Sequence, residues 1–117
     1  MNKLALLFLT LFATASLAQS APTATLTWGA VTTYANGTTI PSTVAVTYNL
    51  YQGATCATVA KVASGITALT DVISTGLTVG NSYAFTISAS AAGIEGAQSN
   101  CGTKAFYAPG TVTLTVN

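Results

Sequence analysis

The chain has 117 residues and a net charge of +1, with no histidine, three Lys or Arg side chains and two carboxylates. Two or three separated cations cannot neutralise a run of phosphates, which excludes nucleic-acid binding. Catalysis by Ser-His-Asp or Cys-His groups is excluded by the missing histidine, and the carboxylates sit apart without partners for acid–base chemistry. We therefore expect no enzyme, no cofactor and, with only two cysteines as further ligands, no metal site.

Residues 1–18 have the pattern of a secretory signal peptide. Lys3 precedes an apolar run over residues 4–13, and small residues at 16–18 precede a cleavage position. This run falls short of the roughly 20 residues that span a bilayer, so cleavage is favoured over a retained anchor. We expect a secreted or extracellular protein, located in the periplasm, on a cell surface or in a virion. Once the signal is cleaved, we expect no membrane association.

The first strand is predicted over residues 23–28, because Ala24, Leu26 and Trp28 alternate with three threonines. Residues 29–42 contain Asn36-Gly37 and Pro41 and are expected to form a long loop. Three further strands are predicted over residues 43–51, 59–64 and 68–74, with a turn at 52–58.

Residues 77–89 join a turn to a strict alternation of apolar side chains. Tyr83, Phe85, Ile87 and Ala89 are expected on the buried face, and Ala84, Thr86 and Ser88 on the other. A second long loop is expected over residues 91–100, followed by a final strand over 101–106.

These features together resemble a fibronectin type III domain. Leu77 lies six residues before Tyr83 with Gly80 between them, which is similar to the tyrosine corner of that family and of related immunoglobulin-like sandwiches. Trp28 resembles the family's core tryptophan, and residues 48–51 resemble its third strand. The resemblance implies an all-β antiparallel β-sandwich over residues 19–107.

The chain departs from the family at its beginning. Only residues 19–22 would precede the Trp28 strand after signal cleavage, although a fibronectin type III domain has a further strand there. We therefore expect that first strand to be missing or stunted.

Cys56 and Cys101 are an even pair in a chain with an export signal, which favours a disulfide. In the family's layout they belong to opposite sides of one sheet, whereas a disulfide joins Cα atoms about 4.4–6.8 Å apart. We favour a bond within the chain, which needs the Cys56 loop to fold over the sheet or the last strand to be displaced. Pairing between molecules and reduced thiols remain the alternatives.

The tail, residues 108–117, continues beyond the expected domain. Val112, Leu114 and Val116 share one face of a predicted strand over residues 111–116, in a pattern that echoes residues 21–28. Three interpretations stay open. The tail is a strand folded onto its own domain, the start of a linker or further domain, or an assembly strand that completes a neighbour's sheet. The last of these would propagate head to tail.

The two long loops lie at the same end in the family's layout, and there we place the candidate binding residues. They are Tyr34, Asn36, Thr38, Ile94, Glu95 and Gln98. We expect a non-enzymatic adhesion or surface-recognition module of a bacterium or phage that binds a cell-surface protein or glycan. The alternative is a structural subunit of a filament, virion or surface layer, a homo-oligomer that self-assembles through its tail strand or an intermolecular disulfide.

Overall fold

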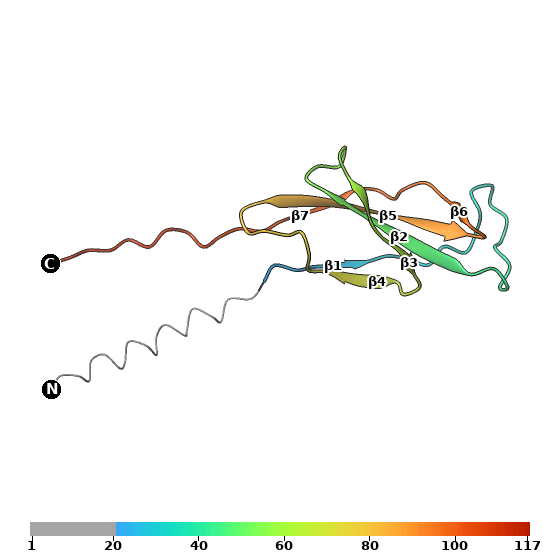
Figure 1. Cartoon of the computed structure of the whole chain (residues 1–117), viewed down its shortest axis with the longest axis horizontal. Coiled ribbons are helices and arrows are strands. Elements are labelled where there is room, and N and C mark those ends of the chain that lie inside the picture. Colours follow the sequence, from blue (N-terminus) through green and yellow to red (C-terminus); the bar gives the residue numbers. More distant parts are fainter. Residues whose placement is uncertain (1–20) are drawn as a thin grey trace, which may run out of the picture.

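Antiparallel strands in two sheets make up the described part of the computed structural model, residues 21–117 (Figure 1). The expected signal peptide, residues 1–18, lies outside the described residues. The strands are β1 (Ala24–Thr27), β2 (Val46–Gly53), β3 (Ala60–Ile66), β4 (Thr70–Ile73), β5 (Ser82–Ala91), β6 (Ile94–Glu95) and β7 (Gly102–Ala105). The all-β, antiparallel class is therefore confirmed, and each strand expected before residue 107 is present within a few residues of its predicted bounds.

The smaller sheet pairs β1 with β4, and the larger sheet has the order β3-β2-β5 with β6 and β7 both on the far side of β5. Strand β5 pairs with β2 along its length, from Val46↔Ala91 to Gly53↔Ala84. Between β6 and β7 the chain stays beside β5, because Gly96 and Ser99 donate backbone hydrogen bonds to carbonyls of β5. β6 and β7 thus form one interrupted edge.

The core lies where the two sheets face each other. Ala24 and Ile73 from the smaller sheet pack with Leu50 and Phe85 from the larger one, and Leu77 closes the cluster. Burying a large apolar side chain stabilises a fold by about 1.5–3 kcal/mol, so these few residues supply much of the hydrophobic stabilisation. The arrangement is a two-layered β structure of the sandwich type.

One end of the core is closed by the turn before β5. The Tyr83 hydroxyl accepts a hydrogen bond from the Thr78 backbone N–H at 2.9 Å, and Leu77 is only 8% exposed. Gly80 adopts a φ of 101°, which favours glycine, and its N–H donates to the Phe106 carbonyl. A tyrosine hydroxyl that bonds to the backbone a few residues upstream is the geometry of a tyrosine corner.

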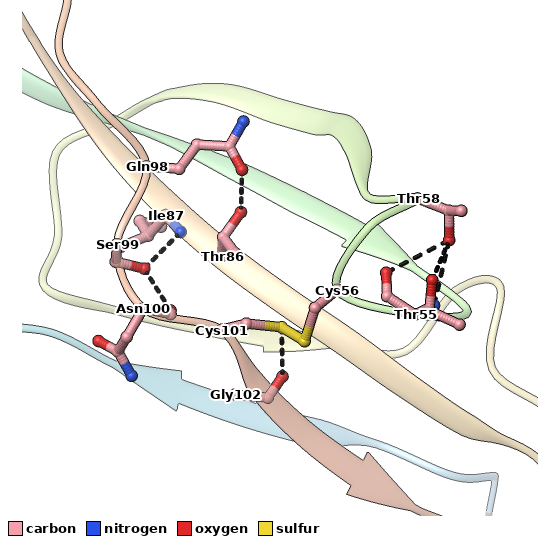
Figure 2. The surroundings of a disulfide bond; sticks show 10 residues. All are labelled: Thr55, Cys56, Thr58, Thr86, Ile87, Gln98, Ser99, Asn100, Cys101 and Gly102. Carbon is pink, nitrogen blue, oxygen red and sulfur yellow. Dashed lines mark hydrogen bonds between the residues drawn. A yellow bond between two sulfur atoms is a disulfide. The ribbon is translucent and has the colours of Figure 1, made fainter.

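The prediction that β5 has one exposed face is wrong. Ala84, Thr86 and Ser88 are all at most 7% exposed, although they point away from the core cluster. The loop after β2 folds across this outer face toward the β7 side (Figure 2). Polar side chains of β2 and β6 surround Ser88. Strand β5 is consequently covered on both faces.

The prediction of an unbroken loop over residues 91–100 is also wrong, because β6 forms a short hairpin with β5. Its turn consists of Ala92 at φ 52° and Gly93 at φ 80°. Two successive positive φ values are typical of a type I′ hairpin turn, which favours Asn-Gly rather than Ala-Gly. Because alanine stands at the first turn position, the sequence gives no signal for this hairpin.

The tail forms no strand, contrary to the expectation for residues 111–116. It extends away from the two sheets (Figure 1), and the side chains of Val112, Leu114 and Val116 are 82–90% exposed. A strand needs a neighbour to receive its backbone hydrogen bonds, and no described segment of the same chain lies beside the tail. The tail strand folded onto its own domain is thus not observed.

Candidate binding groove

A groove of about 1140 Å³ opens between the two sheets, on the side where β1 faces β6 and the segment leading to β7. Core-facing side chains of β2 and β5 form its floor, among them Tyr48, Ile87 and Ala89, and β1 contributes Leu26 and Trp28 to one wall. Ligand sites in proteins usually enclose about 300–1,000 Å³ and are mostly apolar. The groove is thus large enough to receive a segment of polypeptide or a comparable ligand.

The groove is open because β1 is the edge of its sheet. Strand β1 pairs only with β4 among the described residues, and no strand precedes it in residues 21–23. The backbone N–H of Trp28 donates to the Leu69 carbonyl at 3.0 Å, so the backbone groups of Trp28 point toward β4. The backbone groups of Thr25 and Thr27, at the alternate positions of the strand, point the opposite way. Those groups form a free edge beside the groove.

The open side leaves part of the hydrophobic interior incompletely covered. Leu26 and Ile87 are only half-buried, although they pack against the core cluster. Trp28 is also half-buried, with its ring centroid 5.7 Å from that of Tyr48. The Trp28 indole Nε1 is buried and, alone among the buried side-chain nitrogen and oxygen atoms of residues 21–117, has no hydrogen-bond partner. Buried donors normally find an acceptor, so this one is an exception among the buried polar atoms.

Both predicted binding loops reach this groove. Tyr34, in the loop after β1, and Ile94, in β6, line it with side chains that are 38% and 75% exposed. The Tyr34 loop is held in shape by the Thr33↔Thr39 bridge, and the Tyr48 hydroxyl accepts the Val31 N–H at 3.0 Å. Two loops more than fifty residues apart in sequence are thereby brought to one end of the groove.

Three of the predicted binding residues are instead occupied with internal hydrogen bonds. The Asn36 side-chain oxygen accepts the Thr38 N–H at 3.0 Å and its hydroxyl at 2.7 Å, which fixes the turn at Gly37. Gln98 accepts the Thr86 hydroxyl at 2.7 Å on the outer face of β5. These side chains shape the loops, and none of them lines the groove.

Glu95 is the centre of a polar cluster that sequence analysis missed. Its carboxylate accepts hydrogen bonds from the hydroxyls of Tyr51 and Ser88 and lies 2.9 Å from Lys61 Nζ. The Ser88, Tyr51 and Lys61 hydrogen bonds lower the pKa of Glu95 to about 2. The hydrogen bond to Glu95 in turn raises the pKa of Tyr51 and of Lys61. Tyr51 is therefore held in place by this cluster.

The same outer face carries a second unpredicted contact. Asn49 is 4% exposed, and its amide donates to the hydroxyls of Ser88 at 3.1 Å and Ser90 at 2.9 Å. The alternation of β2 places Asn49 and Tyr51 on the face opposite Leu50, and this signal could have located both residues. The outer face therefore ties β2, β5 and β6 together and supports the floor of the groove.

Cys56 and Cys101 form a disulfide within the chain, with their Cα atoms 5.9 Å apart. Figure 2 shows the loop after β2 reaching across β5 to Cys101, which lies just before β7. Gly53 allows the loop to return closely, since a Cβ there would lie 2.5 Å from the Thr58 carbonyl oxygen. The intramolecular prediction is confirmed, with the Cys56 loop folding over the sheet. With both sulfurs paired within the chain, neither cysteine is free for a bond between molecules.

The groove offers apolar, aromatic and hydroxyl groups together with free backbone edges, and these groups support non-covalent binding. No three His, Cys, Asp or Glu side chains cluster within residues 21–117. In the same stretch, no helix is long and apolar enough to cross a membrane.

Comparison with known proteins finds no matching family model, curated protein or solved structure. The fold thus defines a structural class, two packed antiparallel sheets, and the function has to be inferred from the groove itself.

Proposed function

We propose that the protein is an exported, non-enzymatic recognition module of the fibronectin type III type, which binds an extended segment of another molecule in the groove between its sheets. The loops carrying Tyr34 and Ile94 form the open end of this binding surface. A cell-surface protein is the kind of partner that such a groove suits. A glycan would use mainly the loop end.

The observation that supports this proposal best is the free edge of β1 beside an apolar groove. An added strand gains main-chain hydrogen bonds from a free edge and specificity from the side chains that alternate into a groove. Here the edge supplies the backbone groups of Thr25 and Thr27, and the groove exposes Leu26 and Ile87.

Two features support the remaining parts of the proposal. The basic and apolar pattern of residues 1–18 and the Cys56–Cys101 disulfide fit an exported protein. The Tyr83 hydrogen bond to Thr78, with Leu77 buried below it, fits a fibronectin type III-like domain.

The proposal is tested with 8-anilinonaphthalene-1-sulfonate, a dye that fluoresces on apolar surfaces, as a probe of the groove. At a concentration where the chain is monomeric, we expect the dye to bind the protein purified from an exporting host. The variant Ala89→Phe places a large ring on the groove floor and should weaken dye binding at least tenfold. The same change at an exposed turn outside the groove, Ala68→Phe, is the matched control and should bind like the wild type.

Equal dye binding by Ala89→Phe and Ala68→Phe would show that the groove is not the apolar site, and would reject the proposal. Circular dichroism spectra of both variants should match the wild type. If Ala89→Phe fails to fold, the smaller change Ala89→Val takes its place in the same comparison.

A further inference from the structure

We propose that the segment bound in the groove is the tail, residues 111–116, of a second copy of this chain. This inference rests on the proposed function and names its partner. It makes the protein a structural subunit that assembles by donating one strand, with the tail as the donor and the groove as the acceptor.

The tail has the character of a strand that lacks its sheet. Val112, Leu114 and Val116 share one face of the extended segment, and each is at least 82% exposed. Three threonines occupy the other face. Side chains this apolar are rarely left exposed in a contiguous row unless another surface covers them. Residues 108–117 also carry no charged side chain, so the tail suits a groove lined by apolar and hydroxyl groups.

The tail repeats the pattern of the strand beside which it would lie. In β1, Ala24 and Leu26 face the interior while Thr25 and Thr27 face outward, and residues 111–116 alternate threonine with Val or Leu in the same way. A segment with this pattern is suited to the smaller sheet, with threonines outside and aliphatic side chains inside. Its backbone would bond to the free groups of Thr25 and Thr27.

The length of the tail segment also matches that of the groove floor. Six extended residues reach about 20 Å at the usual rise of a strand, and the core-facing positions of β5 from Phe85 to Ala91 cover the same distance. Three aliphatic side chains at alternate positions would then lie above Ile87, Ala89 and Ala91, which are half-buried and line the groove. The donor strand would cover the half-buried Leu26 and Ile87.

The path of the chain favours a second copy over the molecule's own tail. Phe106 exchanges backbone hydrogen bonds with Gly80 and Asn81 at the closed end of the molecule, and the tail leaves the sheets from there. The groove opens toward the opposite, loop end at Tyr34 and Ile94. Figure 1 shows the tail running away from the strands rather than turning back along β1.

Donor and acceptor are different surfaces, and each chain carries one of each. A contact of this kind is head to tail, so repeating it produces a filament, or a ring if the rotation between subunits closes. Assembly should therefore increase with concentration and should not stop at a dimer.

The main test is the molar mass of the full chain, purified from an exporting host, measured by light scattering over a range of concentrations. We expect the wild type to grow beyond the dimer, and Leu114→Asp to weaken association at least a hundredfold. Val62→Asp changes another exposed apolar residue, on β3, and should assemble like the wild type. A wild type that stays monomeric throughout, or a Leu114→Asp variant that assembles normally, would overturn the inference.

A second measurement separates this inference from the proposed function. A synthetic peptide of residues 108–117 should bind the Leu114→Asp chain and should lose at least tenfold in affinity when Ala89→Phe is added. If the dye binds the groove but the peptide does not, the recognition module stands and the tail is the wrong occupant. If neither binds, both proposals fail.

Dye binding also shows whether the tail instead covers the groove of its own chain. In that case the wild type would remain monomeric and would bind the dye much more weakly than Leu114→Asp, and donation to a second copy would be rejected.

Discussion

The closed and the open half of the molecule are built from the same two strands. At the closed end, Leu50 and Phe85 are covered by Ala24, Ile73 and Leu77 and are at most 4% exposed. Two residues further along β5, Ile87 lies in the groove and is only half-buried, because no strand of residues 21–117 pairs with β1 on the side opposite β4. One half therefore provides the stability of the fold, and the other is left free to bind.

Truncating one side chain in each half should show the largest difference in stability between the two halves. Phe85→Ala should cost about 3–5 kcal/mol of the free energy of unfolding, which is enough to unfold many small domains. Ile87→Ala, on the same face of the same strand, removes a half-buried side chain and should cost about 1 kcal/mol. Denaturant unfolding at a concentration where the chain is monomeric measures both. Equal losses would mean that the groove is already filled.

Removing the disulfide should have the next largest effect on the free energy of unfolding. It closes a loop with a sequence separation of 45, so replacing both cysteines by serine should cost up to about 4 kcal/mol in the chain-entropy model. The loop after β2 would also leave the outer face of β5, and hydrogen exchange at Thr86 should become faster. Unchanged stability of the double variant would contradict a disulfide that holds this loop in place.

The tyrosine corner at the closed end should contribute less to the free energy of unfolding. Tyr83→Phe removes only the hydroxyl that accepts the Thr78 N–H, which should cost about 1 kcal/mol. Thr78 and Asn81 hold the pKa of Tyr83 below its ordinary value, and the absorbance of the phenolate at alkaline pH would report this. Tyr34→Phe, at the open end, is the control and should leave the free energy of unfolding nearly unchanged.

Glu95 should make the smallest contribution to the stability of the fold, and this contribution depends on pH. The hydrogen bonds from Ser88, Tyr51 and Lys61 lower its pKa to about 2 from the ordinary value of 4.5. A carboxyl group with a lowered pKa in the folded state stabilises the fold above its unfolded pKa, and this contribution is lost as the pH falls toward the folded pKa. The melting temperature should therefore decline between pH 4.5 and pH 2.

Glu95→Gln isolates this contribution, because an amide does not titrate. Its melting temperature should decline less than that of the wild type over the same interval, as followed by circular dichroism. Parallel curves for the two proteins would show that the cluster around Glu95 adds nothing in solution, as many exposed ion pairs do.

The closed half could be predicted well from the sequence. The alternation at Tyr83, Phe85 and Ile87 marks a strand with a core face, and Leu77 and Gly80 mark the corner before it. Such signals are local, because they depend on the two-residue period of a strand and on the conformational freedom of glycine. The other strands over residues 23–106, apart from β6, can be predicted for the same reason.

The open half and the outer face could be predicted only in part. The brevity of the segment before Trp28 indicates a missing first strand, but the volume that this leaves open depends on how far apart the sheets lie. Glu95, Lys61 and Tyr51 come together from three strands, and no spacing along the chain reveals that contact. Neither the path of the Cys56 loop across β5 nor the hairpin at Ala92 has a local signal.

Hydrogen exchange at single amides of β1 shows whether a second strand pairs with its free edge. Trp28 donates its N–H to Leu69 and should be protected at every concentration, whereas the N–H groups of Thr25 and Thr27 face the groove. We expect these two N–H groups to exchange rapidly in dilute protein and to become protected as the concentration rises and a donor strand binds. Protection of Thr25 and Thr27 in the monomer, or their rapid exchange at all concentrations, would contradict this expectation.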